Sequence, residues 1–263
     1  MELVLTNVSF EEYNLDLKLE GNGLIGITGE DSFAVLKFLT NLPRYNGQIK
    51  YNKEKLTKVS ALTYKNKLAF IEQEPDYPKF IDNVKDYFLY IIRQNEINTK
   101  EDEHKINTAL KIVGLDTKYK EKKLISLSSS EKKLIQIAIK LLSNPDIILF
   151  DEPFKKLDLK HEKALIMLLQ RMQEQYGKII VIATSNSNTL YKYTKNIIIV
   201  KNKKVLLSGV TKECYTRVDY LKKNKIDIPK IVEFVYKAKK DKNVKIDYHQ
   251  DIRDLIKDIY KHV

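Results

Sequence analysis

The sequence predicts an α/β fold in which a mainly parallel β-sheet is covered by helices on both faces. Residues 147–150 and 179–183 are continuous apolar runs, and a helical segment, 160–176, lies between them and ends at Gly177. A strand buried on both faces loses the usual alternation of polar and apolar residues, and a helix that connects two such strands makes them parallel. With 263 residues, the chain is long enough for one large domain and a small appendix.

The other elements are predicted from alternation, helical spacing and turn residues. Alternating apolar residues from Leu3 to Leu19, closed by a turn at 21–23, indicate antiparallel strands at the N-terminus. The further strands are expected at 24–28, 49–51, 68–71, 196–200 and 205–207, and the further helices at 33–42, within 84–113, at 127–142 and at 231–238.

The composition, 43% hydrophobic and 31% charged, is typical of a soluble globular chain. No apolar run approaches the roughly 18 residues of a membrane span, and no basic and apolar leader is evident at the N-terminus. The single cysteine, Cys214, cannot form an internal disulfide, which favours a reducing cytosol.

The net charge of +12 allows two interpretations. A basic chain can bind nucleic acid or an anionic membrane surface. However, only five of the 47 basic residues are arginine, which an AT-rich coding bias also produces, and no basic block is interleaved with aromatic residues. We therefore expect no nucleic-acid partner.

Four motifs follow one another between residues 127 and 158. They are Leu-Ser-Ser-Ser-Glu at 127–131, Asn-Pro-Asp at 144–146, an apolar strand that ends in Asp-Glu-Pro at 151–153, and Leu-Asp at 157–158. In this order and spacing they resemble the signature, Walker B and D-loop motifs of the nucleotide-binding subunit of an ABC transporter. The resemblance implies the P-loop NTPase-like ATPase core of that family, with ATP and Mg²⁺ as cofactors.

The carboxylates of the Asp-Glu-Pro turn are candidates for catalysis, because ligands of open α/β sheets bind at the carboxyl ends of the strands. The resemblance implies that Asp151 holds Mg²⁺ through its water shell and that Glu152 polarises the attacking water. Gln73, in the run 70–75, stands where the family has its Q-loop glutamine. An alternative remains, in which the turn only caps the following helix.

In this family each ATP lies between the P-loop of one chain and the signature of the other. Two glycines of the signature are replaced by serines, whereas the serine that would face a γ-phosphate at a helix N-terminus is retained. The residues that the resemblance assigns to the ATP of a partner are Ser128, Ser129, Ser130 and Glu131 of the signature and Asp158 of the D-loop.

The phosphate-binding loop departs from the family pattern. The pattern G-x-x-x-x-G-K-[ST] aligns with residues 26–33 without a gap, and Gly26 is its first glycine. Asp31 stands at the second glycine and Ser32 at the lysine, and Phe33 replaces the hydroxyl residue that binds Mg²⁺. The loop has the length of the family pattern but lacks its lysine.

The charge of this loop is also inverted. We expect Glu30 and Asp31 to face the polyphosphate and to repel it. The lost charge-assisted hydrogen bond alone is worth roughly 1.5–3 kcal/mol. The remnant loop, with Gly26, Gly29 and Ser32 as its candidate binding residues, is not expected to hold ATP in the usual way.

A second loss concerns the histidine that follows the strand after Walker B in this family. Ser185 stands at that position. We therefore expect Glu152 and Gln73 to be inactive in this chain, with hydrolysis only at the site of a partner.

The chain is expected to have two domains, an ABC ATPase-like domain at 1–210 with a helical subdomain at about 75–145, and an extension at 211–263. The exit at 209–215, the run 221–229 and the helix 231–238 resemble the C-terminal extension of energy-coupling factor ATPases. That resemblance implies that the extension helps two such subunits to dimerise.

Taken together, the motifs favour an ATP-binding-cassette subunit of an energy-coupling factor importer for a vitamin or a metal ion. The chain would be the degenerate half of a heterodimer and would lend its signature to the ATP of a second, intact ABC ATPase subunit. It would lie on the cytoplasmic face of the cell membrane as a peripheral subunit, against a transmembrane coupling subunit. The alternative is a scaffold or regulatory subunit with the ABC fold that binds no nucleotide.

Overall fold

A computed structural model of the chain describes residues 1–57, 60–74, 77–94, 102–242 and 246–262. The strands are β1 (Glu2–Phe10), β2 (Tyr13–Glu20), β3 (Ile25–Thr28), β4 (Asn46–Tyr51), β5 (Glu54–Lys55), β6 (Leu68–Ile71), β7 (Ile147–Asp151), β8 (Ile179–Ala183), β9 (Asn196–Lys201) and β10 (Lys204–Val210). The helices are α1 (Ser32–Asn41), α2 (Ser60–Asn66), α3 (Val84–Gln94), α4 (Asp102–Ile112), α5 (Ser129–Leu141), α6 (Leu159–Tyr176), α7 (Ser187–Tyr193), α8 (Thr211–Tyr215), α9 (Val218–Lys223), α10 (Lys230–Lys242) and α11 (Ile252–His262), with 3₁₀ turns η1 (Thr117–Glu121) and η2 (Leu124–Ser126).

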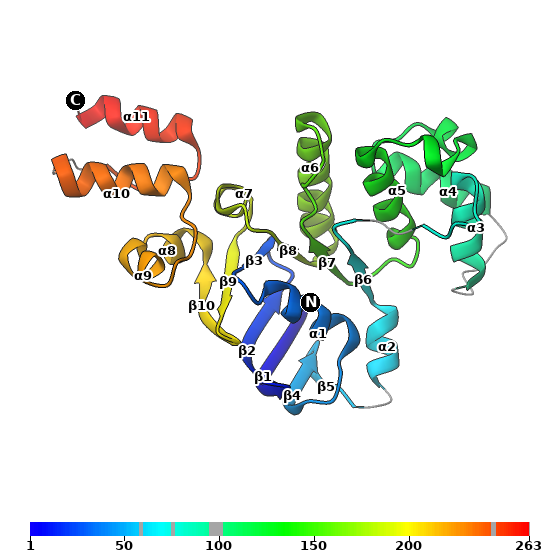
Figure 1. Cartoon of the computed structure of the whole chain (residues 1–263), viewed down its shortest axis with the longest axis horizontal. Coiled ribbons are helices and arrows are strands. Elements are labelled where there is room, and N and C mark those ends of the chain that lie inside the picture. Colours follow the sequence, from blue (N-terminus) through cyan, green and yellow to red (C-terminus); the bar gives the residue numbers. More distant parts are fainter. Residues whose placement is uncertain (58–59, 75–76, 95–101, 243–245, 263) are drawn as a thin grey trace.

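The described strands form one sheet in the order β5-β4-β1-β2-β10-β9-β3-β8-β7-β6. From β9 to β6 every neighbouring pair is parallel, whereas β1 is antiparallel to β2 and β4, and β10 is antiparallel to β9. Figure 1 shows the antiparallel strands at one end of this sheet, with α6 and α7 above it. The predicted α/β class, with a mainly parallel sheet and antiparallel N-terminal strands, is confirmed.

The sheet separates two hydrophobic cores, and β7 contributes to both. Ile148 and Phe150 pack in the core beneath α5 and α6, whereas Ile147 and Leu149 pack in the core beneath α1. All four side chains are fully buried. Burial on both faces explains why this strand is apolar at every position.

The carboxyl ends of the central strands meet at one edge of the sheet. Asp151, the last residue of β7, pairs with Ala183 of β8, and Ala183 pairs with Ile27 of β3. The loops that follow these strands therefore share one edge, where ligands of open α/β sheets bind.

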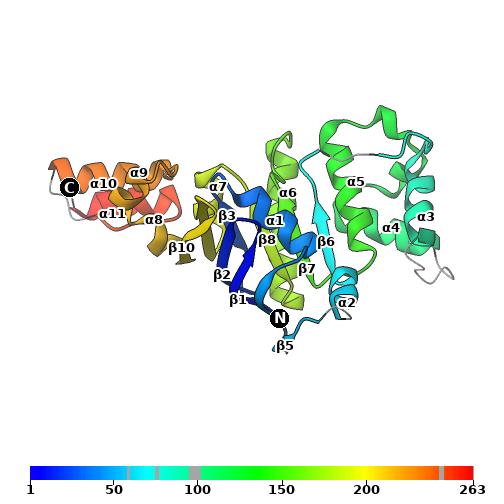
Figure 2. The ribbon, with the colours of Figure 1, turned by 60° about the horizontal axis from the view of Figure 1, so that its bottom comes forward.

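Helices α3, α4 and α5 form a separate layer on one side of the sheet, and Figure 2 shows it at the end opposite to the C-terminus. Their packing rests on buried side chains such as Phe88, Leu110 and Ile135. Residues 75–76, where the predicted subdomain begins, and 95–101, inside the predicted helical stretch 84–113, lie outside the described residues. None of the described helices combines the length and the apolarity that crossing a membrane requires.

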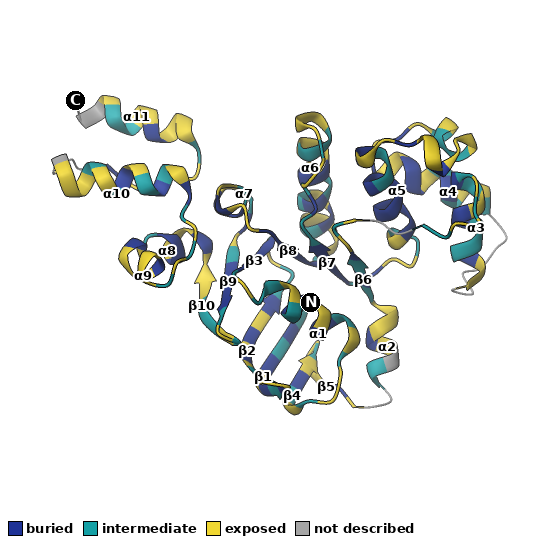
Figure 3. Cartoon of the chain, viewed as in Figure 1, coloured by how far each residue is buried: buried dark blue, intermediate teal, exposed yellow. Residues whose placement is uncertain are grey.

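The chain beyond β10 is helical, as predicted. Tyr215 of α8 is fully buried against Tyr191 of α7, with ring centroids 5.8 Å apart, so the first turn of the extension belongs to the main core. Helices α10 and α11 enclose a small core of their own, formed by Val235, Ile246 and Leu255. In Figure 3 exposed residues cover much of these two helices. A boundary after residue 210 remains our proposal.

Candidate functional site

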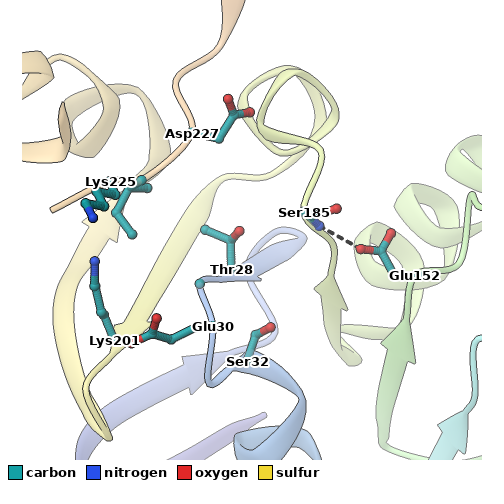
Figure 4. Close-up of a pocket in the computed structure, with 10 residues that line it drawn as sticks. Thr28, Glu30, Ser32, Glu152, Ser185, Lys201, Lys225 and Asp227 are labelled. Carbon is teal, nitrogen blue, oxygen red and sulfur yellow. Dashed lines mark hydrogen bonds between the residues drawn. The ribbon is translucent and has the colours of Figure 1, made fainter.

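A pocket of about 350 Å³ opens where the carboxyl ends of the central strands meet (Figure 4). The loop after β3 contributes Gly29 and Ser32, and the turns after β7 and β8 contribute Glu152 and Ser185. The structure therefore brings together four of the residues that the sequence singled out. Gly26 does not line the pocket, and Gln73 and Ser129 line a different one.

The acidic side chains of the loop after β3 are turned toward the β9–β10 hairpin. The carboxylate of Asp31 accepts hydrogen bonds from Lys203 N (2.8 Å) and from the Tyr13 hydroxyl (3.1 Å). Glu30 lines the pocket, but its Oε1 accepts a hydrogen bond from Asn202 N (3.1 Å). The expectation that both carboxylates face a polyphosphate is thus wrong for Asp31, because the backbone of the hairpin supplies the donors that this carboxylate needs.

The loop also satisfies its own backbone. Ser32 N donates to Gly29 O (3.2 Å), so this N–H is engaged within the loop. Gly29 has a positive φ of 108°, and a Cβ there would lie 2.0 Å from Val200 O of β9. A Cβ at Gly26 would collide with Leu190 of α7. Both glycines are therefore explained by close packing of the fold without a bound phosphate.

Glu152 joins the turns after β7 and β8. Its Oε2 accepts a hydrogen bond from Thr184 Oγ1 (2.7 Å), and its Oε1 accepts one from Ser185 N (2.7 Å). Its own backbone N–H donates to Ala183 O (2.8 Å), and its backbone φ of 43° lies in the left-handed region. The carboxylate that stands at the catalytic position is thus held by two hydrogen bonds from the turn after β8, and the backbone N–H of the same residue adds a third contact to β8, which gives Glu152 a structural role in the fold.

Asp151 lies beside Gln73 and close to a buried lysine. Burial and the neighbouring charge of Glu152 raise the pKa of Asp151, while Lys133 and the backbone N–H of Gln73 oppose the rise. Lys133 of α5 is 2% exposed, and its ammonium donates to Glu72 O (2.9 Å) and Gln73 O. Burial lowers the pKa of Lys133 to about 8, against the attraction of both carboxylates.

The start of α5 is a complete capping box. Ser128 Oγ accepts a hydrogen bond from Glu131 N (3.2 Å), and Glu131 Oε2 accepts one from Ser128 N (2.7 Å). Partial burial by itself raises the pKa of Glu131, but hydrogen bonds from Tyr119, Ser128 and Lys122 lower it to about 2. The helix start is therefore rigid, with Ser128 exposed at its tip.

Lysines surround this helix start. A pocket beside it is lined by Lys132, Lys133, Lys155 and Lys156, together with Gln73, Glu74 and Ser129. Lys156 pairs with Glu74 (2.5 Å). Positive charge and an exposed helix N-terminus together make this edge suited to an anion.

A sequence model described as ABC transporter matches residues 13–155, which is more than half of the chain. The chain belongs to the ABC transporter family. An energy-coupling factor transporter ATP-binding protein, EcfA2 of Mycoplasma capricolum, is 27% identical over 262 residues, which cover 90% of this chain and 89% of the relative.

Two solved structures show the same fold as this ABC chain. The structure of cbiO1 from Clostridium perfringens, described as part of the ABC transporter complex cbiONQ, aligns with a TM-score of 0.70 at 22% identity, over 89% of this chain and 98% of its own. A dimeric ATP-binding cassette in a post-hydrolysis state, bound to ADP and Pi, aligns with a TM-score of 0.67 at 22% identity, over 80% and 98%.

The D-loop residue of the ABC pattern is the N-cap of α6. Asp158 accepts hydrogen bonds from Lys160 N (3.0 Å) and His161 N (2.9 Å), and it also contacts the His161 ring. These bonds lower the pKa of Asp158. The alternative in which the Asp-Glu-Pro turn caps the next helix is therefore wrong, because Asp158 fills that position.

ATP and Mg²⁺, which the ABC family implies, do not fit the remnant loop. Ser32 N bonds within the loop, Ser32 stands where the pattern has its lysine, and Phe33 stands where it has its hydroxyl residue. For Mg²⁺, the part of the chain that the structure describes holds no group of three or more His, Cys, Asp or Glu side chains placed to bind a metal. At the start of α5, in contrast, the side chain of Ser128 is exposed and four lysines line the neighbouring pocket.

Sequence reasoning missed three lysines of the ABC core and its extension. Lys201 ends β9, and the parallel pairing of β9 with β3 brings it beside the loop after β3. The strand 196–200 was predicted, but its pairing with 24–28 was not. Lys225 reaches the same pocket from the chain between α9 and α10, and Lys133 reaches Gln73 across the fold. No local sequence pattern predicts that these two lysines lie at the site.

Proposed function

We propose that the chain is an ATP-binding-cassette subunit of an energy-coupling factor importer for a vitamin or a metal ion. It is the degenerate half of a heterodimer with a second, intact ABC ATPase subunit. The two subunits act on the cytoplasmic face of the membrane as peripheral partners of a transmembrane coupling subunit. The names of the Mycoplasma relative and of the cbiO1 structure support this assignment.

The observation that carries the proposal is the contrast between two helix starts. At α1 the family's lysine is replaced by Ser32, and the neighbouring Asp31 bonds to a hairpin. At α5 the helix start is exposed, capped and surrounded by lysines. An ATP that lies between two chains would thus find its phosphate loop in the partner and a signature in this chain.

Within this proposal the residues at the family's catalytic positions are inactive in this chain. Glu152 is hydrogen-bonded to Thr184 and Ser185. Ser185 stands at the position where the family has its histidine. The Glu152 carboxylate therefore joins the turn after β7 to the turn after β8 by hydrogen bonds. Gln73 remains the candidate link to the membrane subunit, and the extension after residue 210 remains the candidate dimerisation segment.

The first test uses the isolated chain. We expect no measurable binding of Mg-ATP by isothermal titration calorimetry, because the remnant loop lacks the lysine and one N–H of the loop is engaged. An affinity in the micromolar range would contradict our interpretation of the loop around Ser32.

The second test compares the two helix starts in the complex with an intact partner subunit. Ser128→Asp keeps a good N-cap and places a negative charge at the signature. The matched variant Ser32→Asp makes the same change at α1. We expect the ATPase rate of the complex to fall by at least about tenfold in Ser128→Asp, through loss of a charge-assisted contact. Ser32→Asp should leave it unchanged.

One observation favours the alternative, a scaffold subunit that binds no nucleotide. Ser128 Oγ is engaged by Glu131 N, and Ser130 Oγ donates to Lys156 O (3.1 Å), so the signature serines already have partners inside the fold. However, the hydroxyl of Ser128 is still a donor. If the complex hydrolyses ATP equally well with Ser128→Asp, the scaffold function is correct and the signature has no role in catalysis.

A further inference from the structure

A second cavity lies away from the strand ends that carry the candidate site. Its volume is about 550 Å³, and it separates α6 from α4 and from the end of α5. Figures 1 and 2 show α6 and the layer of α4 and α5 facing one another. Pro145, which lies two residues before the start of β7, and Lys178, which directly precedes the start of β8, both line it. The cavity therefore lies at the amino ends of β7 and β8, the opposite edge of the sheet.

Most of the lining is apolar. Met172 is 9% exposed, and Ile112 and Tyr176 are exposed at the rim, 45% and 62% respectively. Leu141 and Leu168 are half-buried between them. A cavity of this size and lining is typical of sites for small organic molecules.

The charged side chains of the cavity all have the same sign. Lys111 of α4, Arg171 of α6 and Lys178 line it, and none of the described residues that line it is Asp or Glu. Arg171 is exposed, and its contact to Gln175 is 3.5 Å long, so its guanidinium is available at the rim. An arginine can bind a carboxylate through two parallel hydrogen bonds.

Lys178 carries its charge at the inner wall. Its side chain is 5% exposed, and its ammonium donates to Asn144 Oδ1 (2.8 Å) and to Pro145 O. Burial lowers the pKa of Lys178, and the charge of Asp146 opposes this shift. Both hydrogen-bond acceptors are neutral, and an ammonium has three N–H donors, so a buried anion would be a favourable further partner.

We propose that this cavity binds a small amphiphilic carboxylate, with an apolar chain or ring against Met172 and Leu168 and its anionic group at Arg171 and Lys178. The observation that carries the proposal is a mainly apolar cavity in which the charged residues, among those of the lining that the structure describes, are all cationic. Because the walls belong to α4, α5 and α6, an occupant contacts both the helical layer and the core. The proposal is independent of the nucleotide role of the chain.

The absence of tryptophan from the sequence allows a direct test. Tyr176→Trp places a single tryptophan at the rim of the cavity, where the native ring is largely exposed. Octanoate is the probe, and 1-octanol is its neutral counterpart with the same chain length. We expect a saturable shift of the tryptophan emission with octanoate, and an affinity for octanol at least about tenfold weaker, because octanol lacks the charge-assisted hydrogen bonds.

Charge reversal then tests the site itself in the Tyr176→Trp background. Arg171→Glu is expected to weaken octanoate binding at least about tenfold. Arg93→Glu, an exposed arginine of α3 that does not line the cavity, is the matched control and should leave it unchanged. Because Arg171 and Arg93 are both exposed, neither variant should unfold the chain, which circular dichroism verifies.

A second variant tests the cavity volume. Thr108→Phe replaces an exposed lining residue of α4 by a larger one and should abolish the emission shift. The proposal is wrong if octanoate gives no saturable shift, if octanol binds as tightly as octanoate, or if binding survives both Arg171→Glu and Thr108→Phe.

Discussion

Two helix starts of this chain, those of α1 and α5, differ in the way their N-cap side chains are hydrogen-bonded. The N-cap of α1, Asp31, makes no capping hydrogen bond with its side chain, which instead accepts from Lys203 N. The N-cap of α5, Ser128, forms a capping box with Glu131. A helix dipole favours an anion at both places. The side chains around it decide which of the two helix starts can accept one.

The neighbours of the two helix starts strengthen the difference. At α1 the pocket contains the carboxylates of Glu30 and Glu152, and the ammonium of Lys201 donates to Asn224 O of the extension. At α5 the neighbouring pocket is lined mainly by lysines. The proposed function therefore assigns the phosphate of a partner's ATP to the start of α5 and none to the start of α1. The predictions below test this difference.

The largest effect is expected from rebuilding the phosphate loop. In the triple variant Asp31→Gly, Ser32→Lys, Phe33→Thr, a lysine and a hydroxyl return to the positions that the loop pattern requires. Two charge-assisted contacts correspond to roughly 10²–10⁴-fold in affinity for Mg-ATP. Isothermal titration calorimetry of the isolated variant measures this gain.

The single variant Asp31→Gly is the control for this experiment. It removes the hydrogen bonds to Lys203 N and the Tyr13 hydroxyl without adding a cation. We expect it to remain without measurable ATP binding. If it binds ATP as tightly as the triple variant, the missing lysine is not what separates α1 from α5.

A smaller effect is expected on stability at alkaline pH. The pKa of Lys133 is about 8 in the folded chain and 10.5 ordinarily, so the unfolded chain binds more protons between these values. The free energy of unfolding should therefore rise with pH across this window, by roughly 3 kcal/mol. Below pH 8 both states are protonated and the contribution is constant. Urea unfolding at several pH values measures the rise.

Lys133→Met should flatten this rise, and Lys132→Met is the matched control at the neighbouring, less buried position. The groups that act on the Lys133 ammonium besides burial are Asp151, Glu152, Glu74 and Lys156. If the free energy of unfolding of Lys133→Met rises with pH as much as that of the native chain, another group is responsible for the pH dependence.

The smallest effect is expected at the capping box. The pKa of Glu131 is about 2, below its ordinary 4.5, so its stabilising contribution is present above pH 4.5 and is lost as the pH falls toward 2. Glu131→Gln keeps the box pattern and removes the charge, so it should lower stability at neutral pH by about 1 kcal/mol and reduce the loss in acid.

Thermal unfolding at neutral and acid pH measures both changes. Glu121→Gln, at an exposed position of η1, is the control and should behave like the native chain. If Glu131→Gln keeps the acid sensitivity of the native chain, the start of α5 does not depend on this carboxylate.

The parts of the fold that were predicted correctly are those with local patterns. The apolar run 179–183 is β8, and the predicted helix 160–176 is α6, which ends at Gly177 with a left-handed φ of 58°. The start of helix α5 is also indicated by the sequence, because Ser128 and Glu131 have the spacing of a capping box. Periodicity and capping depend only on neighbours along the chain, so a single sequence contains them.

The direction of side chains at the candidate site was not predictable in this way. Asp31 was expected to repel a phosphate, yet it bonds to Lys203, 172 positions further along the chain. Glu152 was expected to be inactive, but its hydrogen bonds with Thr184 and Ser185 were not predicted. Such pairs depend on strand order and register, which bring together residues that no local pattern connects.

By itself, therefore, the sequence determined the α/β class, the strand and helix segments, and the positions at which the family motifs are kept or changed. Only the tertiary structure decided what the changed positions do. It showed that Asp31 bonds to a hairpin, that Lys133 is buried beside Asp151, and that Lys225 of the extension reaches the pocket. Hydrogen bonding and charge act over a few ångströms in space, and the folded chain alone sets those distances.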